Sequence, residues 1–363
     1  MRWQGNDTNA NEALSSFSRF PLWMWRNTVI LEFVEWLRHH NEGLPAQHQV
    51  GFYGLDMYSM YESIAAVLEY LDQVDPDAAK KARENYSCLD HTDNAQLYGF
   101  GVKVNQRPSC ENEVVEQLIA LRNKSLVYSK PGDKISEDDQ FQAEQNALLI
   151  KSAESYYRQM FNNRANVWNL RDTHMIETLD NLHNHLSSRS KKSGQVKIAV
   201  WEHNSHLGDA RATYMRNAAQ HNVGQLARER YSDDYVLIGF TTYNGTVTAA
   251  SEWDGPAERK KIRPALAGSI EDIFHKTELQ NFYLRLTGLA NKKIQSLFDE
   301  KKELRAIGVI YRPETERASH YFSCQLANQF DAIIHYDETY ALEPLDSTSE
   351  WTHGEESTFP FGT

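Results

Sequence analysis

The sequence lacks an apolar run long enough to cross a bilayer. A membrane-spanning helix needs about 20 consecutive apolar residues, and the most hydrophobic stretch, LWMWRNTVILEFV at 22–34, is interrupted by Arg26, Asn27 and Glu32. The first residues, MRWQGNDTNANEALSSF, contain no apolar segment of the kind that a signal peptide requires. We therefore expect neither a membrane span nor a signal peptide.

Cysteine is scarce. The chain contains Cys88, Cys110 and Cys324, and no two of them stand in a C-x-x-C pair. An odd and sparse set of cysteines is more typical of a reducing compartment than of a disulfide framework. The expected location is the cytoplasm.

The chain also lacks a basic excess and the common nucleotide motifs. It has 38 Lys and Arg residues against 50 Asp and Glu residues, for a net charge of -12. Because duplex nucleic acids and anionic membranes reward clustered Lys and Arg, neither is expected as a partner. No G-x-G-x-x-G loop, Walker loop or G-x-S-x-G elbow occurs, which argues against dinucleotide, NTP and serine-hydrolase functions. No cofactor is expected.

Shorter apolar runs are present, and they predict strands. They lie at 50–56, 196–201, 235–242, 305–311 and 331–337. The last four are nearly continuous in apolar residues, which is typical of strands buried on both faces of a parallel or mixed sheet that helices cover.

Helical periodicity dominates the region between the first of these runs and the others. With 363 residues and 40% hydrophobic content, the chain can fill a sizeable core. We predict an α/β fold with a mixed or parallel sheet flanked by helices and a large helical insertion. One domain is expected over 1–363, with a helical portion at 57–190 and an α/β core at 191–345.

The most informative polar residues follow the 196–201 run, where WEHNSHLGD places His203 and His206 three residues apart. Ligands of open α/β sheets collect beyond the carboxyl ends of strands, and imidazole exchanges protons near neutral pH. The pair could therefore be an acid/base site. A metal site would need a third ligand, which the spacing does not supply. The alternative without function is that one histidine caps the loop while the other is solvated.

Other polar and aromatic residues are candidates for substrate contact, although each also has a purely structural interpretation as a helix cap, an ion pair or core packing. They lie beyond the predicted strands or at the starts of helices, and they are Trp25, Arg26, Asp56, Tyr58, Arg171, His174, Asn204 and Arg312.

Several longer motifs resemble one known family. In chain order they are RFPLWMWRN (19–27), FVEWLRHHN (33–41), GFYGLDMYSMYES (51–63), WNLRDTHM (168–175), WEHNSHLGDARATYM (201–215), NVGQLARE (222–229), GVIYRPETERASHYF (308–322) and FPFG (359–362). Together they are similar to the erythromycin esterase family, whose relatives include proteins of succinoglycan biosynthesis.

This resemblance implies an α/β fold with a helical portion, and metal-independent hydrolysis of an ester or macrolactone. A histidine would remove a proton from water, which attacks the carbonyl carbon. Two further family histidines correspond to His203 and His206, so the resemblance favours an acid/base or oxyanion-binding role for this pair. The expected partner is a small ester or lactone.

One departure from the family pattern affects these expectations. The family carries a G-E-x-x-H-G segment upstream of RFPLWMWRN that supplies the proposed base, and this sequence has none. Either the natural start lies further upstream or this is a degenerate member, and we expect poor activity from the chain as written. A metal-dependent hydrolase that uses His203 and His206, and a binding protein without catalysis, are the alternatives.

Overall fold

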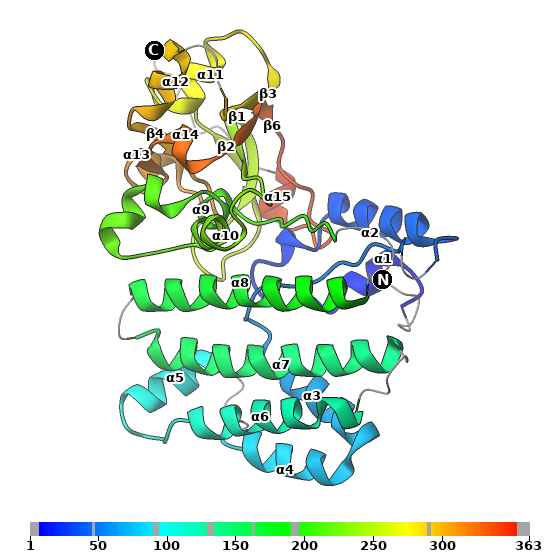
Figure 1. Ribbon diagram of the computed structural model, residues 1–363. Helices are drawn as coiled ribbons and strands as arrows, with labels where there is room; N and C mark the ends of the chain where they lie inside the picture. The colour runs from blue at the N-terminus through cyan, green and yellow to red at the C-terminus, as the bar shows by residue number, and fades with distance from the viewer. Residues whose placement is uncertain are drawn as a thin grey trace. The chain divides into compact units, whose positions relative to one another are not determined.

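A computed structural model describes residues 7–45, 48–89, 94–128, 134–161, 164–189, 196–288 and 292–353 (Figure 1). The FPFG motif at 359–362 lies outside these ranges. The chain divides into two compact units. We call residues 1–53, 201–216 and 228–363 the α/β unit, and residues 54–200 and 217–227 the helical unit.

The helical unit consists of long helices packed side by side. They are α3 (Met60–Val74), α4 (Pro76–Tyr86), α5 (Ala95–Lys103), α6 (Glu111–Tyr128), α7 (Lys134–Gln159) and α8 (Arg164–Arg189). Helix α7 packs against α3, α5, α6 and α8, and Figure 1 shows α6, α7 and α8 as neighbouring rows. Asp75 accepts a hydrogen bond from the Ala78 N–H and Pro76 opens α4, so this helix begins as capping rules require.

The core of the helical unit is apolar and aromatic. It is built from one face of each helix around α7 and includes Met60, Val67, Leu71, Tyr86, Tyr98, Leu121 and Ile150. These residues recur at helical spacing, which is why the sequence predicts the helices of this region well.

The α/β unit contains a four-stranded sheet in the order β2-β1-β6-β3. Its strands are β1 (Ile238–Ala249), β2 (Glu258–Ile262), β3 (Asn281–Arg285) and β6 (Ala332–Thr339). Strands β1 and β6 are parallel, whereas β2 and β3 run antiparallel to their neighbours. A separate antiparallel pair joins β4 (Lys302–Arg305) to β5 (Tyr321–Cys324). The predicted mixed sheet in an α/β fold is confirmed.

The α/β unit also contains helices, most of them short. They are α1 (Ala10–Leu14), η1 (Leu22–Met24), α2 (Thr28–Asn41), α9 (Asn204–Leu207), η3 (Ala210–Ala212), α11 (Ile270–His275), α12 (Lys292–Asp299), η5 (Pro313–Thr315), α13 (Glu316–Ser319), α14 (Leu326–Gln329) and α15 (Ser349–His353). Two further elements, η4 (Tyr214–Ala218) and α10 (Val223–Tyr231), include the boundaries between the units.

Three of the five predicted strands are wrong in whole or in part. Residues 50–56 and 196–201 form no strand, and in the 305–311 run only Arg305 belongs to a strand, while Ile310 makes an isolated parallel bridge to Ala250. The backbone of Val50 instead exchanges two hydrogen bonds with the Asn41 side chain, at 2.8 and 2.9 Å. An apolar run predicts a buried extended backbone, but it does not tell which groups form hydrogen bonds with the N–H and C=O groups of that backbone.

Among the described residues, one face of the sheet is covered more completely than the other. Thr241, Phe282 and His335 share the covered face and are buried or half-buried, with Phe274 of α11 packed against His335. On the opposite face Phe240 is 54% exposed and Tyr283 is 61% exposed. The prediction that the strands are buried on both faces is therefore wrong for this sheet.

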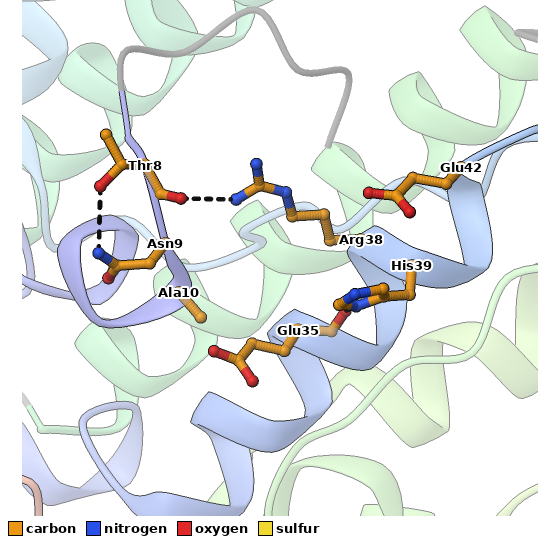
Figure 2. A pocket seen from close by; sticks show the side chains of 7 residues that line it. All are labelled: Thr8, Asn9, Ala10, Glu35, Arg38, His39 and Glu42. Carbon is orange, nitrogen blue, oxygen red and sulfur yellow. Dashed lines mark hydrogen bonds between the residues drawn. The ribbon is translucent and has the colours of Figure 1, made fainter.

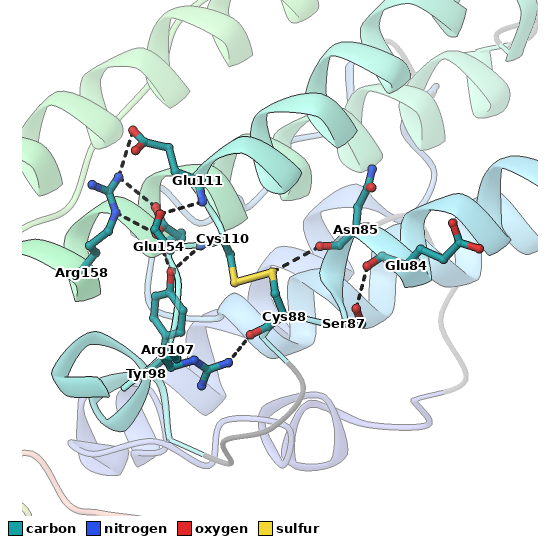
Figure 3. The surroundings of a disulfide bond; sticks show 11 residues. Glu84, Asn85, Ser87, Cys88, Tyr98, Arg107, Cys110, Glu111, Glu154 and Arg158 are labelled. Carbon is teal, nitrogen blue, oxygen red and sulfur yellow. Dashed lines mark hydrogen bonds and ion pairs between the residues drawn. A yellow bond between two sulfur atoms is a disulfide. The ribbon is translucent and has the colours of Figure 1, made fainter. Parts of the chain in front are cut away.

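Cys88 and Cys110 form a disulfide in the helical unit (Figure 3). It connects the residues after α4 to the start of α6, and its Cα atoms lie 6.0 Å apart. Beside it, the Tyr98 hydroxyl accepts a hydrogen bond from the Cys110 N–H and donates one to Glu154. The sparse cysteines favoured a reducing compartment over a disulfide framework, and this disulfide removes the cysteine pattern as an argument for that compartment.

Within the ranges given above, no helix combines the length and the apolar content that crossing a bilayer requires. This agrees with the absence of a long apolar run in the sequence.

Candidate functional site

His203 is the N-cap of the short helix α9. Its Nδ1 accepts the Ser205 N–H at 3.2 Å and lies 2.8 Å from the Ser205 Oγ, while its Nε2 lies 3.0 Å from the carbonyl oxygen of Ile307. A carbonyl oxygen can only accept, so Nε2 carries the proton and Nδ1 is the acceptor. Part of the residue is exposed, but burial of the ring and the nearby His206 lower the pKa of His203. This imidazole is neutral at neutral pH.

His206 lies one turn further along α9. Its backbone N–H donates to the His203 carbonyl at 2.8 Å, and its side chain is buried, with 8% exposed. The charge of His206 adds to the lowering of the His203 pKa, and the two residues stand three apart on the same turn. One histidine does cap the loop, as the alternative without function supposed, but the other is buried rather than solvated.

Asn204 is engaged with the edge of the sheet. Its side-chain amide donates to the Phe240 carbonyl at 2.6 Å and accepts the Phe240 N–H at 3.1 Å. The amide thus continues the hydrogen-bond pattern of β1 as a neighbouring strand would. This role holds α9 against β1.

Trp25 belongs to an aromatic cluster close to the histidine turn. Its ring centroid lies 6.2 Å from that of Trp201, two residues before His203, and 6.0 Å from that of Phe52. Trp201 is 65% exposed, so the cluster offers apolar surface to solvent. The sequence interpretation overlooked Trp201, although an aromatic residue directly before the histidine motif was a usable signal.

The two predicted arginines of the α/β unit bind backbone and carboxylate partners. Arg26 donates to both oxygens of Asp346, at 2.6 and 2.9 Å, and to the Leu14 carbonyl. Arg312 is exposed and its Nε donates to the Ser251 carbonyl at 2.7 Å. Arg26 is therefore committed to an ion pair, and Arg312 is fixed at the loop after β1.

The four predicted residues of the helical unit form one cluster. Arg171 of α8 binds Asp56 through two hydrogen bonds, of 3.0 and 2.7 Å, and its guanidinium lies over the Tyr58 ring at 4.8 Å. Burial raises the pKa of the Tyr58 hydroxyl, which lies 3.4 Å from the Tyr156 hydroxyl. Tyr156, on α7, was not predicted from the sequence.

His174 lies one helical turn after Arg171 and is the most deeply buried member of this cluster. Burial lowers its pKa to about 4, although the charge of Asp56 opposes this shift, and Lys151 adds to it. Its Nε2 lies 3.4 Å from the Thr178 hydroxyl, and its Nδ1 is buried without a hydrogen-bond partner. A neutral imidazole with an unused nitrogen is a candidate ligand contact.

A hollow of about 280 Å³ lies elsewhere on the α/β unit (Figure 2). Arg38 reaches across it to the Thr8 carbonyl at 3.1 Å. It is lined by Thr8, Asn9, Ala10, Glu35, Arg38, His39 and Glu42. It contains none of the predicted site residues, so we do not assign it to their chemistry.

Three or more His, Cys, Asp or Glu side chains do not converge in metal-binding geometry anywhere in the described ranges. The His203–His206 turn accordingly acquires no third ligand of this kind from the residues that the structure describes.

Comparison with known structures supports the same fold at low sequence identity. A succinoglycan biosynthesis protein has a TM-score of 0.72 and 20% identity, covering 93% of this chain and 78% of that chain. A Bacillus cereus protein has a TM-score of 0.69 and 17% identity, covering 93% and 79%. A mutant of the erythromycin esterase EreC in its open conformation has a TM-score of 0.62 and 16% identity, covering 93% and 81%.

The sequence itself identifies the family. The pattern of the erythromycin esterase family matches residues 2–339, a range that includes the His203–His206 turn and the Asp56–Arg171 cluster. With this match over most of its length and the shared fold, the chain belongs to the erythromycin esterase family.

Proposed function

We propose that the chain hydrolyses an ester or lactone by attack of water on the carbonyl carbon, assisted by His203 and His206. The observation that carries the proposal is that two histidines stand three residues apart on one turn, α9, within a chain of the erythromycin esterase family. No cofactor or metal ion is required by this proposal.

The neutral state of His203 favours a role in charge stabilisation. A neutral imidazole can donate a hydrogen bond to the oxygen that becomes negative as water attacks. At neutral pH the ring is already in this form and need not lose a proton first. The lowered pKa of His203 keeps the ring in this form. Its Nε2–H is bound to the Ile307 carbonyl, so substrate would have to replace that acceptor.

Substrate contacts are proposed on each unit. Trp25, with its neighbour Trp201, offers apolar surface on the α/β unit. On the helical unit, Tyr58, Arg171 and the unused nitrogen of His174 offer polar contacts beside Asp56. Within the α/β unit, Asn204, Arg26 and Arg312 hold their own loops through the hydrogen bonds described above.

The solved relatives guide the choice of substrates. A panel should contain a macrolactone, because EreC is an erythromycin esterase, and an acylated polysaccharide, because another relative is a succinoglycan biosynthesis protein. Small aryl esters complete it.

The decisive experiment compares the wild type with His206→Ala, and with His39→Ala as a control for loss of an exposed histidine. Hydrolysis should fall at least 100-fold in the first variant and stay unchanged in the second, with equal far-UV circular dichroism. Removal of an acid/base or oxyanion group typically costs 10²- to 10⁴-fold in rate. Unchanged turnover in His206→Ala would refute the proposal, and binding of a substrate without turnover by the wild type would favour the binding-protein alternative. Dialysis against a chelator should leave the rate unaltered.

A further inference from the structure

The more exposed face of the four-stranded sheet is apolar and aromatic. Phe240 of β1, Ile334 of β6 and Tyr283 of β3 are register partners, so their side chains lie side by side on this face. Ile238 and Tyr336 stand two residues away from this row along their strands and share the face. All of them except Ile334 are between 37% and 61% exposed. We call these five residues the open face. A contiguous apolar surface of this kind marks a binding surface.

The last described helix of the chain, α15, lies on the same side of the sheet. Trp351 of α15 donates a hydrogen bond from its indole Nε1 to the Thr248 hydroxyl at 2.9 Å, and the Arg259 guanidinium lies over its ring at 5.6 Å. Thr248 follows Phe240 by eight residues on β1, whose pairings keep a constant register. Side chains at even spacing on a strand share a face. The chain therefore leaves its last described residue, His353, on the side where the open face lies.

Residues 354–363, GEESTFPFGT, follow His353 and lie outside the described residues. We call them the tail. Phe361 is the eighth residue after His353, and a chain spans at most about 3.3–3.6 Å per residue, so this ring can reach about 26–29 Å. Along β1, the eight residues from Thr248 to Phe240 also cover about 26 Å, at about 3.3 Å per residue. The tail is therefore long enough to bring its aromatic residues to the open face.

The spacing of the aromatic residues in the tail matches the spacing of the rows on the sheet. Phe359 and Phe361 are two residues apart, so in an extended chain their rings point to the same side. Pro360 favours an extended conformation both for itself and for the residue before it. On the sheet, the row that contains Tyr336 and the row that contains Phe240 are also two residues apart.

The charges of the tail fit the same path. Glu355 and Glu356 precede the aromatic residues and are the first charged residues after His353. Arg259 and Lys261 of β2 are exposed, and they are the register partners of Thr248 and Thr246 on this side of the sheet.

An extended tail would thus pass the basic side chains with its acidic residues and then reach the open face with its aromatic residues.

We propose that the open face is the docking surface of the chain's own tail. Phe359 packs beside Tyr336, and Phe361 packs beside Phe240. A short tether holds the tail at an effective concentration on the order of 1 mM, so a contact with a Kd near 1 mM between separate molecules is about half occupied within one chain. A second copy of the chain at micromolar concentration cannot compete with this tether. The inference does not depend on the proposed hydrolysis.

The first test locates the tail in the full chain. Phe361→p-benzoylphenylalanine is irradiated as an equal mixture of ¹⁴N- and ¹⁵N-labelled chains at low micromolar concentration, and the digest is analysed by mass spectrometry. Links from the tail to peptides of β1, β3 or β6 should join peptides of the same isotope only. Mixed-isotope links to these strands would show that a second copy covers the face. Links to other elements, or none, would show that the tail does not reach it. Each of these results overturns the proposal.

The second test measures how well the open face is covered. Hydroxyl-radical footprinting should label the open face about twofold faster in the double variant Phe359→Ser/Phe361→Ser than in the wild type, because a half-occupied contact is lost. Trp36 of α2, which is 57% exposed, should react equally in both and is the internal reference. Equal labelling of the open face in the two proteins, or protection that grows with protein concentration, would overturn the proposal.

The matched control removes two exposed apolar side chains from another element. Leu126 and Val127 of α6 are 86% and 77% exposed. Leu126→Ser/Val127→Ser should leave the labelling of the open face at the wild-type rate. If this variant raised the rate as much as the tail variant does, the effect would not be specific to the tail and the proposal would fail.

Discussion

The two units satisfy their polar groups in different ways. In the α/β unit, ion pairs such as Arg26–Asp346 occur, but several buried or loop-forming side chains bind backbone: Asn41 binds Val50, Asn204 binds Phe240, and Arg305 donates to three carbonyl oxygens. In the helical unit, the charged side chains described above pair mainly with one another, as in Asp56–Arg171, Asp138–His185, Glu154–Arg158 and Asp72–Arg83.

The difference follows from the elements themselves. A helix pairs its own backbone groups along most of its length, so the side chains of the helical unit are free to pair together. The α/β unit has short strands and long connections, whose backbone groups need partners from elsewhere. Its polar side chains therefore help to hold the backbone in place. Removing such a side chain should lower the free energy of unfolding more in the α/β unit than in the helical unit.

The largest effect is expected at Arg305. This side chain is buried, and it donates to the carbonyls of Arg263, Thr242 and Tyr243 and to Glu316. Arg305→Met leaves a buried carboxylate without its cation, which costs about 3–5 kcal/mol. Denaturant unfolding should find this loss in the free energy of unfolding of the α/β unit.

The control for Arg305 is Arg216→Met, because Arg216 is an exposed arginine of the same unit. It should change the free energy of unfolding by less than about 0.5 kcal/mol. If Arg305→Met lowered the free energy of unfolding as little as Arg216→Met does, hydrogen bonds from side chains to the backbone would not distinguish the two units.

The next effect concerns acid, and it belongs to the helical unit. Burial lowers the pKa of His174 from 6.5 to about 4. The unfolded chain then binds a proton that the folded chain resists, so the stability present above pH 6.5 is lost as the pH falls to about 4. The loss amounts to about 3 kcal/mol.

His174→Leu removes this group and provides the measurement. Its free energy of unfolding should fall less steeply than that of the wild type between pH 6.5 and 4, and the two curves should be parallel above pH 7. Curves that stay parallel throughout the acid range would mean that His174 is protonated equally in both states.

The disulfide sets the helical unit apart from the α/β unit, where Cys324 is a free and buried thiol. Reduction of the Cys88–Cys110 bond opens a loop of about 22 residues and should lower the free energy of unfolding of the helical unit by about 2–3 kcal/mol. Alkylation in denaturant followed by mass spectrometry should label one cysteine before reduction and three after it. Three labelled cysteines without reduction would show that the bond does not form in the sample.

The sequence predicted the helical unit better than the α/β unit for a physical reason. Amphipathic helices are local, so their apolar spacing is visible in the letters. The runs at 50–56 and 196–201 predict strands because they are apolar, whereas a strand also needs a neighbouring strand that the run itself cannot specify. Strand β3 (Asn281–Arg285) was missed for the opposite reason, since its exposed face interrupts the apolar pattern.

The candidate site was predictable only in part. Asp56, Tyr58, Arg171 and His174 were named from short motifs, and the helical unit brings them together. The contact of Tyr58 with Tyr156 was not predicted, because the two residues are far apart in the sequence and no motif connects them. Three-dimensional pairing of this kind requires coordinates.

The smallest effect is expected at Asn204. Its side chain could either hold α9 against β1 or contact the substrate, and one variant can separate these two roles. Asn204→Ala removes two hydrogen bonds to Phe240 at the edge of β1. Each is worth about 0.5–1.5 kcal/mol, and solvent can reach this edge, so we expect a loss of about 1 kcal/mol in the free energy of unfolding. If Asn204 only holds α9 in place, KM for the best ester should change less than twofold at temperatures where the variant is folded. A KM raised tenfold or more with unaltered stability would assign the Asn204 amide to substrate binding instead. Asn204 would then be a residue of the α/β unit whose side chain serves a partner other than the backbone, as the paired side chains of the helical unit do.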